Sequence, residues 1–217
     1  MHVRMNHYTK VIKNTVILDD VSLSLERGHI YGLYGKNGSG KTMLLRAISG
    51  LIHPTRGEVI IDEKVLHKDM DFPKNTGIII ENLSLYPQYS AYQNLYLLSK
   101  IQKKASREDI ITTLKKVGLD PYNKNKIKTY SLGMKQKLNI AQAIFENQDL
   151  ILLDEPTNGL DDQSIENIYQ LFHELASQDK TIVIASHDKE DLLKHCDQIF
   201  RVSHGKVIKE IEKNMDI

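Results

Sequence analysis

The segment Gly35-Lys36-Asn37-Gly38-Ser39-Gly40-Lys41-Thr42 fits the phosphate-binding pattern of a glycine, any four residues and then Gly-Lys-Ser or Gly-Lys-Thr. Glycines let the backbone adopt dihedral angles that other residues avoid, so that successive N–H groups turn inward toward phosphate oxygens. The pattern predicts that Lys41 reaches the β- and γ-phosphates of a nucleotide and that the Thr42 hydroxyl binds Mg²⁺. Further phosphate contacts are predicted for Gly35, Asn37, Gly38, Ser39 and Gly40.

The neighbours of this loop support the interpretation. Residues 30–34, Ile-Tyr-Gly-Leu-Tyr, are typical of a short buried strand, and the apolar spacing over residues 43–49 indicates a helix. A helix N-terminus favours anions because its unpaired N–H groups and its dipole both point at them. A glycine-rich turn that matched the pattern by chance would lack this strand and helix. We therefore expect a nucleotide-binding α/β protein.

Composition and charge narrow the class of protein. The chain has 217 residues, of which 41% are hydrophobic and 26% charged, as in ordinary soluble domains. Its 29 basic and 28 acidic residues give a formal net charge of +1, which offers no electrostatic case for binding nucleic acid or acidic lipid. The lysine-rich segments 103–104 and 124–128 are interpreted as solvated faces.

The sequence also bears on location. A single cysteine, Cys196, leaves no partner for an internal disulfide and fits a reducing cytosol. No apolar run approaches the length of a membrane span, and the first residues lack the apolar core of a signal peptide. We expect a cytoplasmic protein that is peripheral on the inner face of the cell membrane through a partner.

Hydrophobic periodicity predicts the arrangement of strands and helices. Alternating apolar residues indicate β-structure over residues 2–25, around a turn at Asp19-Asp20. Further strands are predicted at residues 58–62, 77–81, 150–153 and 181–185, with a closing hairpin across His204-Gly205. Buried strands that alternate with helices suggest a mainly parallel sheet covered on both faces.

Residues 83–128 differ in character from the rest. They are rich in Lys, Asn and Tyr and show helical spacing up to Gly118, which indicates a separate helical lobe. Four tyrosines there admit two interpretations that the sequence does not separate. Either they line a groove for a helix of a membrane partner, or they pack the lobe itself. The four residues are Tyr86, Tyr89, Tyr92 and Tyr96.

Two acidic residues follow the apolar strand at 150–153. Asp154 lies at the carboxyl end of that strand, where the ligands of open α/β sheets gather, and can hold Mg²⁺ together with Thr42. Glu155 is a candidate to orient or deprotonate an attacking water molecule. An acidic turn alone is common in α/β proteins, but behind a phosphate loop the pair predicts nucleotide hydrolysis.

Over nearly its whole length the sequence resembles the nucleotide-binding subunits of ABC transporters. Residues 35–42 match the first nucleotide motif of that family, and residues 150–154 match the second. The resemblance implies that Glu155 is the catalytic base and that His187 contacts the γ-phosphate. Residues 158–161, Asn-Gly-Leu-Asp, resemble the loop that communicates between two sites. In the family signature, here Ser131-Leu132-Gly133-Met134-Lys135, Ser131 and Gly133 would contact ATP on an opposing subunit.

The resemblance implies a fold and a set of partners. The fold is an α/β P-loop NTPase core of the ABC type, with an antiparallel β-subdomain and an inserted helical subdomain. Residues 1–82 and 136–217 would form the core and residues 83–135 the helical signature subdomain, in a single ATPase domain. Two such subunits, identical or sibling, would bind two ATP molecules head to tail beside an integral membrane permease subunit. No nucleic acid is expected as a partner.

Three positions depart from the family pattern. The signature has Leu132 and Met134-Lys135 where the family usually has a second glycine and a glutamine. Glu81 stands where the family usually has a glutamine that touches Mg²⁺, and it keeps an oxygen ligand while adding a charge. Ile12 lies near the expected adenine-stacking position without an aromatic face, and the register of Tyr8 does not suit that role.

The expected function is ATP hydrolysis, with Mg²⁺ as cofactor, that drives transport through a separate membrane subunit. The Glu81 variant and the signature resemble a subgroup that exports bacteriocins, lantibiotics or peptide antibiotics. One alternative is a soluble ABC-type ATPase associated with nucleic acid or the ribosome, although long coiled coils and tandem cores are absent from the sequence. A regulatory module that holds ATP without hydrolysing it is the other, and Glu155 with His187 argues against it.

Overall fold

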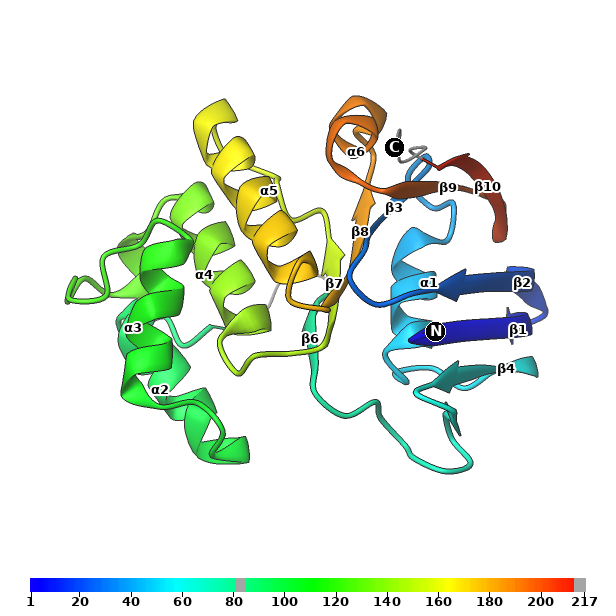
Figure 1. The fold of residues 1–217 in the computed structure, drawn as a ribbon, viewed down its shortest axis with the longest axis horizontal. Coiled ribbons are helices and arrows are strands. Elements are labelled where there is room, and N and C mark those ends of the chain that lie inside the picture. Colours follow the sequence, from blue (N-terminus) through cyan, green and yellow to red (C-terminus); the bar gives the residue numbers. More distant parts are fainter. Residues whose placement is uncertain (81–84, 213–217) are drawn as a thin grey trace.

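The computed structural model describes residues 1–80 and 85–212 and contains two β-sheets (Figure 1). An antiparallel sheet has the strand order β2-β1-β4-β5, and a six-stranded sheet has the order β10-β9-β3-β8-β7-β6. In the larger sheet β6, β7, β8, β3 and β9 run parallel, and β10 pairs antiparallel with β9. The strands are β1 (Val3–Ile12), β2 (Thr15–Leu25), β3 (Ile30–Tyr34), β4 (Arg56–Ile61), β5 (Lys64–Val65), β6 (Thr76–Ile79), β7 (Leu150–Asp154), β8 (Thr181–Ser186), β9 (Gln198–Ser203) and β10 (Lys206–Glu212).

Helices cover both faces of the larger sheet. On one side α1 lies between this sheet and the antiparallel sheet, and on the other side α4, α5 and α6 pack against it (Figure 1). The helices α2 and α3 lie beyond α4, away from the strands. The helices are α1 (Lys41–Ile48), α2 (Ala91–Gln102), α3 (Arg107–Lys116), the 3₁₀ turn η1 (Ile127–Thr129), α4 (Leu132–Ile144), α5 (Asp162–Ala176) and α6 (Lys189–His195). The predicted fold class, an α/β core with an antiparallel β-subdomain, is confirmed.

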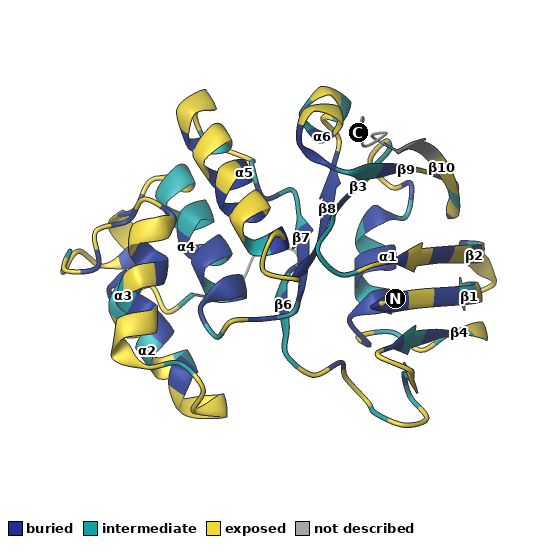
Figure 2. Ribbon diagram, in the orientation of Figure 1, coloured by how far each residue is buried: buried dark blue, intermediate teal, exposed yellow. Residues whose placement is uncertain are grey.

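Alternation along the central strands divides the core into two layers. In β7, Leu150 and Leu152 pack toward α1, whereas Ile151 and Leu153 pack toward α4 and α5. All four side chains are buried, as a strand covered on both faces requires (Figure 2). The rigid sheet built in this way fixes the positions of the loops at the carboxyl ends of β3, β7 and β8.

The first hairpin differs from the sequence prediction. The chain turns at Lys13-Asn14, where both residues have positive φ, and not at Asp19-Asp20. Asp19 and Asp20 lie inside β2, at a shift in the register between β1 and β2. A two-residue hairpin turn of this kind needs positive φ at both positions, and Asn tolerates that conformation. The predicted hairpin across His204-Gly205 is confirmed.

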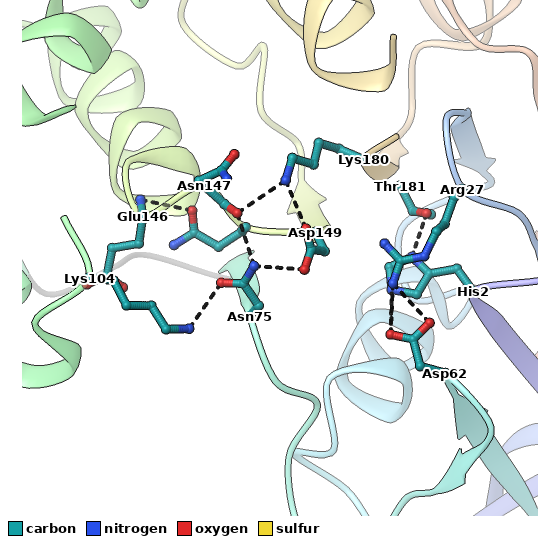
Figure 3. A network of polar contacts seen from close by, with 11 residues as sticks. His2, Arg27, Asp62, Asn75, Lys104, Glu146, Asn147, Asp149, Lys180 and Thr181 are labelled. Carbon is teal, nitrogen blue, oxygen red and sulfur yellow. Dashed lines mark hydrogen bonds and ion pairs between the residues drawn. The ribbon is translucent and has the colours of Figure 1, made fainter. Parts of the chain in front are cut away.

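A polar network joins the loops at the amino ends of the central strands, opposite the phosphate loop (Figure 3). Asp149 accepts hydrogen bonds from Asn75 Nδ2 and Lys180 Nζ, each at 2.8 Å. Burial of Asp149 opposes its ionisation, but these two hydrogen bonds together with the positive charges of Lys180 and Arg27 outweigh burial and hold its pKa below the ordinary value. Lys104, which follows α2, donates to Asn75 Oδ1 at 3.2 Å and so connects the α2–α3 loop to the sheet.

Gly77 provides a test of how β6 packs. A Cβ added at this glycine would overlap the carbonyl group of Ala143 in α4. Gly77→Ala should therefore lower the free energy of unfolding by about 3 kcal/mol, because the helix backbone must move away from the strand. The measurement is urea unfolding. Gly118→Ala is the graded control, since its Cβ meets only Lys137 Nζ at 3.6 Å and strain from its φ of +75° costs about 1 kcal/mol. Equal losses in the two variants would contradict this packing.

Candidate functional site

The phosphate loop connects β3 to α1, as the sequence predicts. Gly40 precedes the helix with φ +115°, a conformation that side-chain-bearing residues rarely adopt, and no side chain within residues 1–80 and 85–212 caps α1. Gly35 is required for a different reason, because a Cβ there would overlap the carbonyl oxygen of Val202. The first N–H groups of α1 therefore face the loop without a side-chain partner, which is the arrangement that binds anions at helix N-termini.

Two polar side chains in the loop are poised for an anion. Lys41 Nζ is buried and donates to Gly35 O at 2.7 Å, so the ammonium group is held within the loop. Ser39 is 9% exposed, and its hydroxyl has no hydrogen-bond partner among the described residues. A buried hydroxyl without a partner is destabilising unless a ligand satisfies it. Both groups fit a nucleotide phosphate.

Thr42 and Asp154 meet at the carboxyl end of β7. Thr42 Oγ1 donates to Asp154 Oδ2 at 2.5 Å, across 112 positions of the sequence. A hydroxyl and a carboxylate are hard oxygen donors of the kind that Mg²⁺ selects, and magnesium sites usually add phosphate oxygens and water to one or two protein ligands. The described residues contain no cluster of three or more His, Cys, Asp or Glu side chains able to hold a metal alone. The donor set therefore fits Mg²⁺ bound together with a nucleotide.

Glu155 and His187 also lie together. His187 Nδ1 is 2.9 Å from Glu155 Oε2, and Ser186 Oγ is 3.4 Å from the same oxygen. Glu155 has a φ of +49°, and its N–H donates to Ala185 O at 2.8 Å. This backbone conformation turns the chain sharply after Asp154. As a result the Asp154 carboxylate contacts Thr42, whereas the adjacent Glu155 carboxylate contacts His187. Glu155 is 22% exposed and His187 62% exposed, so the pair is open to water and to a ligand.

A cleft of about 870 Å³ opens beside the phosphate loop. It is lined by residues 34–39 at the end of β3 and in the loop, by His187, and by residues 201–204 at the end of β9 and in the β9–β10 turn. The structure thus brings His187 and the loop to one cleft. Arg201 in β9 and His204 in the turn after it are lining residues that sequence reasoning missed, because no recognisable motif marks either position.

The signature residues lie elsewhere in the chain. Ser131 caps α4 by accepting a hydrogen bond from Met134 N at 3.2 Å, so this segment opens a helix as predicted. Gly133 packs against Gly159, where a Cβ would come within 2.8 Å of Gly159 O. Neither Ser131 nor Gly133 lines the cleft beside the phosphate loop of its own chain.

Gln136, one turn into α4, is a positioning residue that sequence reasoning did not single out. Its Nε2 donates to Glu155 O at 3.1 Å and to Pro156 O at 3.0 Å. The amide therefore joins the signature helix to the turn that carries the candidate base. The only signal in the sequence was a glutamine next to the signature, with no indication of its backbone partners.

The predicted roles of two site residues, Ile12 and Glu81, stay predictions. Ile12 ends β1 at the hairpin turn and is 40% exposed, so it is accessible, but its role against adenine stays a prediction. Tyr8 is fully buried and donates its hydroxyl to Ile52 O, which excludes it from stacking on a base. Glu81 lies outside the described residues, and its predicted contact with Mg²⁺ also stays a prediction.

Comparison with known sequences agrees with this geometry. A family model described as ABC transporter matches residues 18–158. YybJ of Bacillus subtilis (strain 168), an uncharacterized ABC transporter ATP-binding protein, is 50% identical over 205 residues that cover 94% of each chain. The bacitracin transport ATP-binding protein BcrA of Bacillus licheniformis is 34% identical over 96% of this chain and 69% of its own. The lantibiotic transport ATP-binding protein SrtF of Streptococcus pyogenes is 33% identical over 97% of this chain and 90% of its own.

Comparison with solved structures gives the same result. The dimeric structure of MJ0796, a bacterial ABC transporter cassette, superposes with a TM-score of 0.87 at 27% identity, covering 97% of this chain and 98% of that one. A dimeric post-hydrolysis state of MJ0796 bound to ADP and phosphate superposes with a TM-score of 0.85 over the same shares. The chain belongs to the ABC transporter family, as an ATPase that forms the ATP-binding subunit of a transporter.

Proposed function

We propose that this subunit hydrolyses Mg²⁺-ATP in a head-to-tail dimer and thereby drives export of a peptide antibiotic, bacteriocin or similar substrate through a separate permease. The observation that carries the catalytic part is the set of contacts at the carboxyl ends of β3, β7 and β8. There the loop lysine Lys41, the Thr42–Asp154 pair and the Glu155–His187 pair occupy one edge of the sheet.

ATP would bind with its phosphates on the loop. The ammonium group of Lys41 would exchange its bond with Gly35 O for β- and γ-phosphate oxygens, and Ser39 would gain a partner that its hydroxyl does not find among the described residues. Thr42 and Asp154 would hold Mg²⁺, with Glu81 as a further proposed oxygen ligand. The bound ion would neutralise charge on the β- and γ-phosphates.

Glu155 would act as the general base. Its carboxylate would accept the proton of a water molecule as that water attacks the γ-phosphate, and ADP would leave with the electrons of the broken bond. His187, held 2.9 Å from the same carboxylate, would orient Glu155 and donate a hydrogen bond to the γ-phosphate. Since phosphoryl transfer needs little covalent help, positioning and charge stabilisation account for the catalysis.

A second subunit would complete the site. Ser131 and Gly133 do not line the cleft of their own chain, and they begin a helix whose N-terminus favours an anion. Both facts support a γ-phosphate contact across a dimer, as does the dimeric structure of MJ0796. We also propose that residues 1–82 and 136–217 form the nucleotide-binding core and residues 83–135 the helical signature subdomain, which α4 joins to the core because it runs without a break across position 135.

The relatives support the proposed location and the proposed transport role. No helix in the described ranges, 1–80 and 85–212, has the length and apolar character to cross a membrane. We place the chain in the cytoplasm, on the inner face of the membrane beside its permease. The names of BcrA and SrtF support export of an antibiotic or lantibiotic and favour a transporter over a soluble ATPase on the ribosome or nucleic acid.

A detergent pull-down of the tagged chain from its native cells tests this assignment, with mass spectrometry of the bound proteins. A stoichiometric polytopic membrane protein is the expected result, and the cells lacking that protein should then become sensitive to one antibiotic peptide. Recovery of ribosomal or DNA-associated proteins in its place would remove the transporter assignment and leave the soluble ATPase.

The base of the nucleotide should be weakly selected. Ile12 offers an apolar surface without a ring, and Tyr8 is buried, so stacking that distinguishes adenine from guanine is not available from either residue. We expect ATP and GTP to bind with affinities within about tenfold of each other. A tenfold ratio corresponds to about 1.4 kcal/mol, which is the scale of a single good contact to the base. Competition between the two nucleotides for a fluorescent analogue measures the ratio. A preference of more than about a hundredfold would show that another group reads the base.

A further inference from the structure

The charge of this protein is unevenly distributed. Residues 85–131, called here the basic lobe, contain nine lysine and arginine residues and three acidic residues. The basic lobe therefore carries a formal charge of +6, whereas the whole chain carries +1 and the remainder −5. All nine cationic residues are exposed: Lys100, Lys103, Lys104, Arg107, Lys115, Lys116, Lys124, Lys126 and Lys128. The near-neutral total conceals a strongly basic surface.

Aromatic contacts connect several of these cations. Lys100 Nζ lies 4.2 Å from the centre of the Tyr96 ring, and Arg107 Cζ lies 5.9 Å from the same ring. Arg107 and Lys124 in turn line one cleft of about 570 Å³, together with Tyr122 and other residues of α2 and α3. The end of α2, the start of α3 and the loop at residue 124 thus form one continuous cationic and aromatic surface.

The loop at residues 122–128 extends this surface. It carries Lys124, Lys126 and Lys128 at alternate positions and begins with Tyr122, which is 69% exposed. Two backbone bonds, from Ile127 N to Tyr89 O at 3.0 Å and from Lys128 N to Pro87 O at 3.1 Å, hold the loop beside the segment of Tyr86 and Tyr89. Tyrosine and lysine together are typical of protein surfaces at the membrane–water boundary.

Two of the three acidic residues of the basic lobe accept hydrogen bonds from its own backbone. Asp109 accepts from Ser106 N at 2.8 Å in a capping box, and Asp120 accepts from Tyr122 N at 2.9 Å. Glu108 lies beside Asp109 in the first turn of α3, where a helix dipole favours negative charge. These roles are structural, so they leave the cations of the loop and of α2 to set the sign of the surface.

We propose that the basic lobe binds anionic phospholipid headgroups at a membrane surface. The cations are spread over α2, α3 and the 122–128 loop and do not converge on one pocket, which favours an extended charged surface over a single acidic peptide segment. Anionic lipids attract lysine and arginine clusters in this way, and each cation near the surface contributes about fivefold in binding. The lobe would orient the ATPase against the membrane, a role that requires neither nucleotide nor permease and so stands apart from the proposed function.

The test is flotation of the purified full-length chain with two kinds of vesicles, phosphatidylcholine alone and phosphatidylcholine with one third phosphatidylglycerol. The test variant combines Lys124→Gln, Lys126→Gln and Lys128→Gln. The matched control combines Lys13→Gln, Lys64→Gln and Lys74→Gln, which removes the same charge from exposed lysines outside the basic lobe. Thermal unfolding and ATPase activity in solution, expected to equal those of the parent in both variants, report whether each variant folds.

The parent and the control should float with the anionic vesicles at low salt and not with the neutral vesicles. The test variant should lose about a hundredfold in affinity for the anionic vesicles. Binding of the parent to neutral vesicles, or equal affinity in the test variant and the parent, would overturn the proposal. So would a single-stranded RNA oligonucleotide that binds the parent more tightly than the anionic vesicles do in the same buffer, because the surface would then be a nucleic-acid site.

Discussion

Glu155→Gln should reduce the steady-state turnover of ATP by on the order of a thousandfold, which is the scale of general base catalysis. The amide keeps the shape of the side chain and can still accept hydrogen bonds from Ser186 and His187, so the local structure should persist. It cannot accept a proton from the attacking water at neutral pH. ATP affinity should remain within a few-fold of the parent, because the phosphates are held by the loop.

The measurement pairs a phosphate-release assay with nucleotide binding at equilibrium. Glu190→Gln is the matched control, since it removes the same charge from an exposed residue of α6, a few positions after His187. The control should keep the parent's turnover. If Glu155→Gln retained turnover within tenfold of the parent, Glu155 would not be the base.

The second large effect is expected at the phosphate loop. Lys41→Ala should weaken ATP binding by on the order of a hundredfold, because it removes charge-assisted hydrogen bonds to the phosphates in a partly buried site. Lys41 is 6% exposed and already donates to Gly35 O, so its ammonium group is fixed where phosphate oxygens would lie. The loss should appear in binding itself, in contrast to Glu155→Gln.

Lys36→Ala provides the comparison within the same loop. Lys36 is exposed at the cleft, and its substitution by alanine removes the same charge as Lys41→Ala. The two substitutions therefore have a similar long-range electrostatic effect on ATP binding. We expect its ATP affinity to change by about threefold, as for a screened surface charge. Titration with a fluorescent ATP analogue measures both variants. Unchanged affinity in Lys41→Ala would contradict the contact assigned to this lysine.

The site could be predicted from sequence wherever a short motif fixes its own backbone. The phosphate loop is defined by glycines within eight positions, and Asp154 and Glu155 lie at the end of an apolar strand. Each of these features can therefore be recognised from a short stretch of sequence. The pairing of Thr42 with Asp154 needed one further step, the rule that ligands gather at the carboxyl ends of parallel strands. The distance between them is a property of the sheet and required the structure.

Other features depend on contacts that no local pattern records. Gln136 reaches backbone carbonyls 19 and 20 positions away, and carbonyl groups have no sequence signature. The first hairpin was misplaced because Asp19-Asp20 looks like a turn, whereas Lys13-Asn14 lacks the glycine that usually marks one. Net charge conceals a further feature of this kind, since a total of +1 averages a basic lobe with an acidic remainder.

The most direct test of the central claim is the rate of phosphate release from Mg²⁺-ATP by the purified chain as its concentration is raised. Two copies must share each site in the proposed dimer, so the rate per chain should rise with concentration, approach a plateau and fall to background when Mg²⁺ is chelated. A rate that stayed at background at every concentration would contradict hydrolysis. If the rate per chain stayed the same from the highest protein concentration to the lowest, the site would not be shared between two copies.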